Sequence, residues 1–213
     1  MKITIIYDNT SYISDLTADW GFSCLIQGDD LPNILFDTGA NGNILLSNMK
    51  KLHINPDDIE LVFISHNHFD HTGGLSAFLN VNKHVTLYVP RSLRGIRNVK
   101  EVVHVTDAIK ITKNVFSTGE LENIEQSMAV KTDKGLVLVN GCSHPRMSTI
   151  LDKASGFGKV YAIVGGFHGF SDYELFKDME LICSTHCTQH KQEIKSLYPD
   201  KVTEGGAGKI IEF

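Results

Sequence analysis

The chain has 213 residues, enough to bury a sizeable core, and this length is typical of a single domain. Its apolar fraction of 42% and charged fraction of 21% are typical of soluble globular proteins, and no apolar run approaches the ~18 residues that a membrane span needs. The net charge of −5, without a long Lys/Arg run, argues against a large nucleic-acid interface, because neutralising phosphates requires clustered positive charge.

The elements expected along the chain begin with a strand at 2–7, where polar and β-branched residues alternate without the apolar core of a signal peptide. Further short runs rich in Val, Ile, Leu and Phe, bounded by Gly, Asn, Asp or Pro, predict buried strands. These strands are expected at 22–27, 33–37, 61–65, 84–89, 109–117, 127–132, 135–140, 159–164, 180–184 and 208–213. Short amphipathic helices are expected at 41–52, 73–80, 146–154, 172–178 and 188–197. This mixture predicts one layered α/β domain over residues 1–213, with helices covering the outer faces of sheets.

Four cysteines, one of them isolated at Cys24, do not form the dense disulfide framework of small secreted domains, which favours a reducing cytoplasm. The only basic stripe is formed by Arg91, Arg94, Arg97 and Lys100. Its three-residue spacing suits one face of a helix, and a solvated helix or loop is expected there rather than an anion site.

The chemistry is concentrated after the predicted strand 61–65, in the run His66-Asn67-His68-Phe69-Asp70-His71-Thr72-Gly73-Gly74. Neutral imidazole and carboxylate are preferred ligands of zinc and similar divalent ions, and a loop leaving a strand can turn alternate side chains toward one point. The spacing His-x-His-x-Asp-His therefore predicts ligands for two neighbouring metal ions from a single loop.

This run, with Gly73-Gly74 behind it, resembles the signature of the metallo-β-lactamase superfamily of hydrolases. The other motifs that resemble this superfamily, in family order, are Phe36-Asp37-Thr38-Gly39, Gly141-Cys142-Ser143-His144, Gly165-Gly166-Phe167-His168 and Ser184-Thr185-His186-Cys187-Thr188. The resemblance covers nearly the whole chain. It implies an αββα sandwich, two mixed sheets flanked by helices, with metal ions at one edge.

Residue by residue, the resemblance implies two metal sites bridged by a hydroxide. His66, His68 and His144 would form the first site, and Asp70, His71 and His186 the second, with Asp70 also serving catalysis. Two divalent ions are expected, zinc first, with manganese and iron as alternatives that the ligand set also suits. Asp37 is expected outside the ligand set, where it would hydrogen-bond the loop or a ligand histidine.

The pattern departs from many superfamily members after the predicted strand 159–164, where Gly165-Gly166-Phe167-His168 stands in place of an aspartate that bridges the metals. His168 is therefore a candidate catalytic residue, either as a substitute ligand or as a hydrogen-bond donor to an anionic substrate. Together with the opening Tyr7-Asp8-Asn9, these motifs resemble the branch named for 7,8-dihydropterin-6-methyl-4-(β-D-ribofuranosyl)-aminobenzene-5′-phosphate synthase. The resemblance implies a small, phosphate-bearing, pterin-like substrate, whose phosphate could meet the basic stripe or the backbone N–H groups of residues 72–74.

Alternatives remain open from the sequence. On the same site, a phosphodiesterase or a lactonase is one alternative, and a non-catalytic metal-binding sensor or scaffold is another. Cys142, Cys183 and Cys187 are expected to pack in the core or around the ligands, because free cysteines are usually buried. The remaining histidines, His53, His84, His104 and His190, are expected at the surface without a role.

Overall fold

The protein is described by a computed structural model that covers residues 1–97 and 99–213. Within these residues the strands form two sheets, one of seven strands in the order β13-β1-β2-β3-β4-β5-β6 and one of six in the order β12-β11-β10-β9-β8-β7. The strands of the first sheet are β1 (Lys2–Tyr7), β2 (Ser23–Gln27), β3 (Ile34–Phe36), β4 (Leu61–Phe63), β5 (Thr86–Pro90), β6 (Glu101–Val105) and β13 (Ile210–Glu212). Those of the second are β7 (Ile109–Lys110), β8 (Val115–Ser117), β9 (Met128–Thr132), β10 (Gly135–Asn140), β11 (Val160–Gly165) and β12 (Leu181–Ser184).

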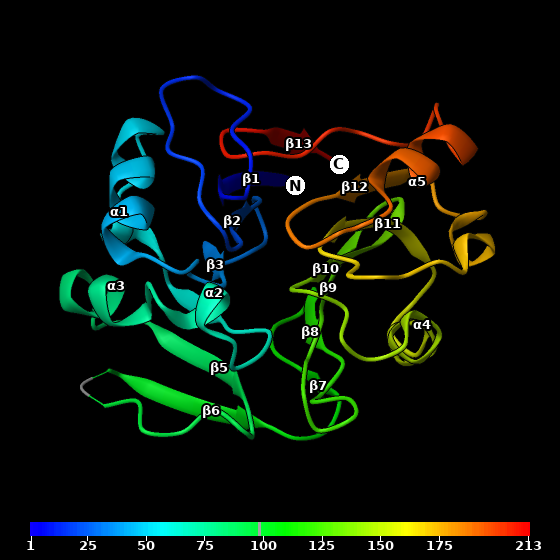
Figure 1. The fold of residues 1–213 in the computed structure, drawn as a ribbon. Coiled ribbons are helices and arrows are strands. Elements are labelled where there is room, and N and C mark those ends of the chain that lie inside the picture. Colours follow the sequence, from blue (N-terminus) through cyan, green and yellow to red (C-terminus); the bar gives the residue numbers. More distant parts are fainter. Residues whose placement is uncertain (98) are drawn as a thin grey trace.

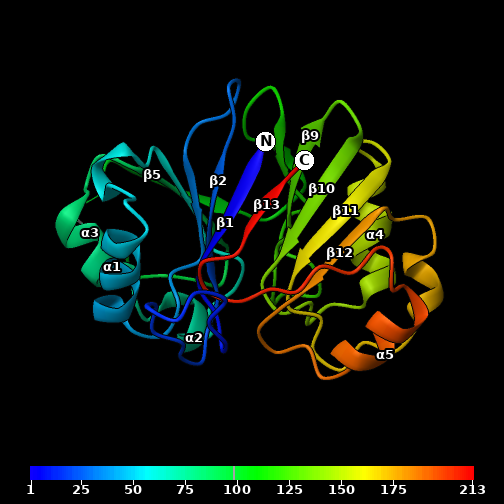
Figure 2. The same ribbon diagram turned by 90° about the horizontal axis from the view of Figure 1, so that it is seen from above.

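The helices lie on the outer faces of the two sheets, so that four layers are stacked (Figure 1, Figure 2). Helices α1 (Gly42–Lys51) and α3 (Leu75–Val81) cover the first sheet, and α4 (Met147–Ser155) and α5 (Lys191–Leu197) cover the second. Shorter pieces are α2 (Phe69–Thr72) and the 3₁₀ turns η1 (Pro56–Asp58) and η2 (Tyr173–Phe176). The predicted αββα sandwich of two mixed sheets is therefore confirmed.

The period-two pattern of the strands explains the layers. In β4, Leu61 and Phe63 face the core between the sheets, whereas Val62 between them packs against the helices on the outer face. Because central strands such as β3, β4 and β10 are apolar on both faces, each sheet can be buried on both sides.

The order and direction of the strands place the carboxyl ends of β1, β3, β4, β10, β11 and β12 along one edge of the sandwich. Strand β1 is antiparallel to β2 and β2 to β3, so β1 and β3 run in the same direction, and β4 is parallel to β3. In the second sheet β10, β11 and β12 are mutually parallel. The segments after these strands carry all the motifs identified in the sequence, and they meet at this edge.

Some predicted elements were wrong. Residues 109–117 form a hairpin, β7 and β8, because the chain turns at Thr112 to Asn114, where the backbone N–H groups of Ile111 and Thr112 bond to the carbonyl of Val115. Strand β6 was not predicted, since this edge strand carries Glu101 and His104 and lacks an apolar run. The helix expected at 172–178 is only the 3₁₀ turn η2.

The basic stripe is not a helix face. Its three arginines lie in exposed turn and loop structure between β5 and β6, where Gly95 has a φ of 85° that interrupts any helix. The expected solvated loop is confirmed for Arg91, Arg94 and Arg97.

Candidate metal centre

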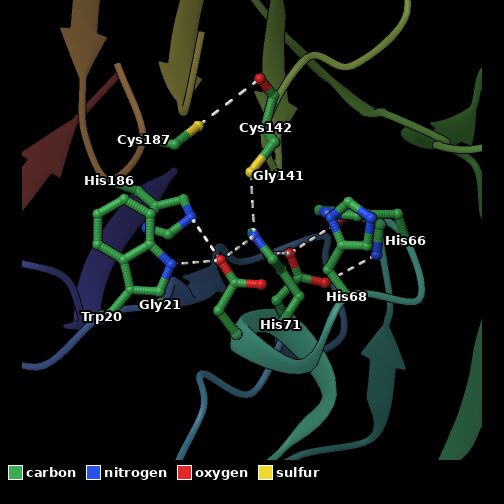
Figure 3. Close-up of polar contacts among 12 residues, drawn as sticks. Trp20, Gly21, His66, His68, His71, Gly141, Cys142, His186 and Cys187 are labelled. Carbon is green, nitrogen blue, oxygen red and sulfur yellow. Dashed lines mark hydrogen bonds and ion pairs between the residues drawn. The ribbon is translucent and has the colours of Figure 1, made fainter. Parts of the chain in front are cut away.

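Histidine rings from both sheets gather at the shared strand edge. The centroid of His66 lies 4.5 Å from that of His68, 4.2 Å from that of His71 and 4.8 Å from that of His144. The rings of His68 and His144 are 4.6 Å apart, and those of His71 and His186 are 4.9 Å apart. Segments that are separated by up to 120 positions in the sequence therefore form one cluster, shown in part in Figure 3.

On the side of the first sheet, Asp37 and Ser65 fix two of these rings. Asp37 Oδ2 lies 2.7 Å from Nδ1 of His71, and it also accepts the hydroxyl of Ser65 at 2.7 Å. The backbone N–H of Ser65 donates to Asp37 Oδ1, and the Ser65 hydroxyl lies 2.9 Å from Nδ1 of His66. Because Nδ1 is engaged in both rings, their Nε2 atoms face the cluster. The expected hydrogen bond between Asp37 and a histidine of the motif is confirmed for His71.

Two glycines allow the histidine segment to approach the neighbouring loop. A Cβ on Gly73 would collide with the carbonyl oxygen of Ala40, and one on Gly74 with that of Thr38. The backbone N–H groups of residues 72, 73 and 74 already bond to the carbonyls of His68, Phe69 and Gly39. They cannot receive a phosphate, so the anion site suggested at 72–74 was wrong.

On the side of the second sheet, the buried carboxylate of Glu125 organises the loop 141–144. Its Oε1 accepts the backbone N–H groups of Gly141, Cys142 and Ser143 at 2.9–3.1 Å, and Oε2 accepts that of His144 at 2.9 Å. Glu125 is fully buried, and burial raises its pKa although the backbone donors of His144, Cys142 and Ser143 oppose the shift. This side chain fixes the direction in which Cys142 and His144 point.

His186 is held by two residues that follow β1. Asp8 Oδ1 accepts its backbone N–H at 2.8 Å, and Asn9 Oδ1 lies 2.9 Å from its Nδ1. Asn9 Nδ2 also donates to the carbonyl of His186. Since an amide oxygen can only accept, Nδ1 of His186 carries the proton and Nε2 has a free lone pair.

Asp70 joins the two sides. Its Oδ2 lies 3.2 Å from Nε2 of His186 and 3.8 Å from Nε2 of His71, and it accepts the indole N–H of Trp20 at 2.9 Å (Figure 3). Burial acts to raise the pKa of this carboxyl, but the neighbouring imidazoles of His186 and His71 hold it below its usual range. Asp70 is therefore ionised at neutral pH.

Two thiols extend the cluster. Cys142 Sγ lies 3.2 Å from Nε2 of His71, and Cys187 Sγ lies 3.8 Å from the carbonyl of Cys142 (Figure 3). All four cysteines are free and buried, and Cys183 and Cys24 belong to the core between the sheets.

The cluster has the chemistry of a metal site. Among the described residues, Nε2 of His144 and of His186 are buried without any hydrogen-bond partner, which is costly unless another group occupies that position. Burial and the neighbouring histidines lower the pKa of His144 to about 4 and lower that of His66 further, so these rings are neutral, the form that binds cations. Donor atoms within 4.8 Å of one another come from Asp70, His71, Cys142 and His186 in one group and from His66, Cys142 and His144 in another.

Backbone strain is concentrated here. Among the non-glycine residues with positive φ are Asp37 (53°), Ser143 (60°), His168 (45°) and His186 (46°), all at this edge. Such conformations cost free energy and are retained mainly where surrounding structure enforces them, as in functional sites.

The structure thus brings together His66, His68, Asp70, His71, His144 and His186. His168 is exposed and lies on the periphery, with its ring 4.9 Å from that of His144 and with Cys142 and Cys187 nearby. Glu125, Asn9 and Trp20 could not be assigned a role from the sequence, because none stands in a metal-ligand spacing. The four unassigned histidines lie outside the cluster; of these His53, His84 and His104 are exposed, as expected.

A cavity of about 440 Å³ opens beside His144 and His168. Its walls include Arg146 and Ser148 at the start of α4 and Phe170 on the opposite loop. The cavity therefore offers one cation, polar hydroxyl and backbone groups, and an aromatic ring next to the histidine cluster.

Residues 19–118 match the sequence profile of the metallo-beta-lactamase superfamily. A solved structure described as Tm1679, a metal-dependent hydrolase of the beta-lactamase superfamily, is 25% identical, with a TM-score of 0.79 over 100% of this chain and 99% of the other. Zn(2+)-bound PqqB from Methylobacterium extorquens shares the fold at 12% identity, with a TM-score of 0.65 and full coverage of both chains. Residues 19–118 therefore carry a metallo-beta-lactamase superfamily domain, and the whole chain has the fold of the enzymes of this superfamily.

Among curated proteins, the chain is similar to the 7,8-dihydropterin-6-methyl-4-(beta-D-ribofuranosyl)-aminobenzene-5'-phosphate synthase of Methanocaldococcus jannaschii. The two are 29% identical over 99% of this chain and 95% of the relative. The alignment runs over 282 positions, more than the 213 residues of this chain, so the relative has residues without counterpart here. A hydroxyacylglutathione hydrolase of Buchnera aphidicola is 28% identical over 42% of this chain and 34% of the relative.

No helix in the described part of the chain is both long and apolar enough to cross a membrane.

Proposed function

We propose that this protein is a metal-dependent hydrolase-type enzyme with a dinuclear centre, acting on a small, phosphate-bearing, pterin-like substrate. The observation that carries the proposal is the convergence of six donor side chains, five of them with donor atoms in two close groups and His68 with its ring 4.5 Å from that of His66. Within this cluster the buried Nε2 atoms of His144 and His186 lack a hydrogen-bond partner. His66, His68 and His144 would hold one divalent ion, and Asp70, His71 and His186 the other. Zinc is the first candidate, because histidine and aspartate are among its preferred ligands.

Two divalent ions, when bound, supply a nucleophile at neutral pH by lowering the pKa of water and stabilise charge on the attacking and leaving oxygens. The protein's own contribution is positional. Asp37 and Asn9 hold the rings of His71 and His186 in one tautomer, and Glu125 holds the loop that carries His144. No serine or cysteine is needed as a nucleophile.

The cavity beside His144 suits the proposed substrate class. Arg146 can pair with a phosphate, and the ring of Phe170 offers an aromatic surface for a flat heterocycle. His168 lies on the wall between this cavity and the cluster, where it can donate a hydrogen bond to an anionic group. Arg146 and His168 thus replace residues 72–74 as the proposed phosphate contacts.

The first test is elemental analysis of the gently purified protein beside two variants, His68→Ala in the cluster and His104→Ala at an exposed site elsewhere. Two metal ions per chain in the natural protein and in His104→Ala, with a sharp fall in His68→Ala, are the expected result. One ion per chain would show that the centre is mononuclear and overturn the dinuclear proposal. No metal after incubation with zinc, manganese or iron would overturn the proposal and leave a scaffold without a metal.

The substrate class is tested by comparing turnover of pterin phosphates, simple phosphate monoesters, phosphodiesters and lactones by the metal-loaded protein. Turnover of pterin phosphates, with KM raised about tenfold or more by Arg146→Ala, is expected because a charged hydrogen bond contributes roughly 1.5–3 kcal/mol. Preference for diesters or lactones would instead identify the corresponding hydrolase on the same site. A loaded protein that turns over none of the four classes would favour a metal-binding sensor.

A further inference from the structure

The thiol of Cys142 lies between the two proposed ligand sets. Its Sγ forms one group with the donor atoms of Asp70, His71 and His186 and a second group with those of His66 and His144. Within each group, all donor atoms lie within 4.8 Å of one another. Two atoms that bind one zinc ion at roughly 2.0–2.3 Å lie at most about 4.6 Å apart, close to the 4.8 Å limit within these groups, so a small side-chain movement brings them into range. One sulfur atom is therefore in reach of both sites, and the side chain is only 3% exposed.

The direction of this thiol is fixed by the loop that carries it. The backbone N–H of Cys142 donates to the buried carboxylate of Glu125 at 2.9 Å, and the next residue, Ser143, has a φ of 60°. The sulfur then lies 3.2 Å from Nε2 of His71, whose other nitrogen is bound to Asp37. Cys142 thus contacts the nitrogen that faces the proposed metal centre.

The charge and space around the centre favour a thiolate there. Asp70 is the only anionic side chain among the six proposed ligands, although two divalent ions carry four positive charges. The residues directly after β11, Gly166-Phe167-His168, include no carboxylate, and a Cβ on Gly166 would lie 2.5 Å from the carbonyl oxygen of Gly141 and 2.7 Å from Cys187 Sγ. That position has no room for an acidic side chain, whereas Cys142 is already in place.

We propose that Cys142 is a ligand of the metal centre, a thiolate shared by the two sites that supplies the negative charge missing after β11. The inference rests on the proposed metal centre. On binding, the thiol loses its proton to solvent and forms a metal–sulfur bond, as coordinating thiols do. Sulfur ligation also favours zinc and other thiophilic ions over magnesium or calcium.

The test is X-ray absorption of the zinc-loaded protein, together with the near-ultraviolet absorption of the cobalt(II)-loaded protein. The natural protein and the core control Cys183→Ser should both show a zinc–sulfur shell at about 2.3 Å, beside nitrogen and oxygen at about 2.0–2.1 Å. They should also show a sulfur-to-cobalt charge-transfer band. Both signals should disappear in Cys142→Ser and in Cys142→Asp, and the carboxylate of Cys142→Asp should preserve more of the metal content than serine does.

The outcomes separate this inference from the metal centre itself. Full metal content without any sulfur signal in the natural protein would refute the role of Cys142 and leave the dinuclear proposal intact. Loss of the sulfur signal in Cys187→Ser but not in Cys142→Ser would assign the ligand to the other thiol and equally refute it. Absence of bound metal in all variants would overturn the metal centre and, with it, the inference. Circular dichroism of both Cys142 variants verifies that a lost signal does not reflect unfolding.

Discussion

The two sides of the candidate metal centre are built in different ways. On the first sheet, His66, His68, Asp70 and His71 come from one short segment after β4, and a side-chain carboxylate, Asp37, holds it. On the second sheet, His144, His168 and His186 come from three separate loops. There the support acts mainly on the backbone, through Glu125 at the loop of His144 and Asp8 at that of His186, while Asn9 holds the ring of His186.

This difference predicts different consequences of damage. A change at Asp37 should act on two neighbouring rings and leave the fold intact, because the segment is also fixed by α2 and α3. A change at Glu125 should affect folding as well as the site, since four buried backbone donors depend on one side chain. The second side is therefore expected to be the more fragile.

The largest effect is expected for Glu125→Ala. Each unsatisfied buried donor costs about 1–3 kcal/mol, so the free energy of unfolding should fall by at least about 3 kcal/mol, measured by urea denaturation. The matched control is Glu122→Ala in the same loop, where an exposed carboxylate accepts a single long bond of 3.4 Å from Arg146, and a change below about 0.5 kcal/mol is expected. Similar losses in both variants would remove the distinction between the two sides.

Replacement of Asp37 by asparagine should weaken metal binding about 10- to 100-fold, as for other groups that orient a ligand histidine. The amide oxygen is uncharged, so it accepts the hydrogen bonds of His71 Nδ1 and the Ser65 hydroxyl more weakly than the carboxylate does. Competition with a chelator of known affinity measures the change, with the exposed Asp152→Asn on α4 as the control. An unchanged affinity would show that Asp37 has a structural role only.

Asn9→Ala should weaken metal binding by about tenfold, at the lower end of the range for such orienting groups, because the bond to His186 Nδ1 is uncharged. Titration of the same chelator gives the value, and Asn43→Ala, an exposed residue on α1, should have no effect. A loss larger than that of Asp37→Asn would reverse the proposed ranking of the two supports.

The smallest effect is expected for Trp20→Phe. This change removes the indole N–H that donates to Asp70, but the side chain is 58% exposed, so water can replace the donor. Metal affinity should fall by roughly two- to fivefold, the equivalent of a modest hydrogen bond. If the fall matched that of Asp37→Asn, Trp20 would have to be counted among the main supports of the centre.

Much of the fold followed from local pattern. The run Leu61 to Phe63 and the strands 2–7 and 135–140 are apolar, short and bounded by turn residues, so their positions were predicted closely. The hairpin at 109–117 and the edge strand β6 were not, because one depends on a turn without glycine or proline and the other exposes a polar face. The resemblance to a superfamily, rather than the pattern, gave the arrangement in four layers.

For the site, the sequence by itself determined the donors that stand close together, because a strand end followed by His-x-His-x-Asp-His needs only local geometry to form a ligand set. Tertiary structure decided the rest. Glu125, Asn9 and Cys142 acquire their positions only because β1, β10 and β12 end at the same edge as β4, and such long-range juxtaposition leaves no spacing in the sequence. The same cause decides where an anion could bind, since the backbone donors at 72–74 already bond to the carbonyls of His68, Phe69 and Gly39, while Arg146 lines the cavity beside the cluster.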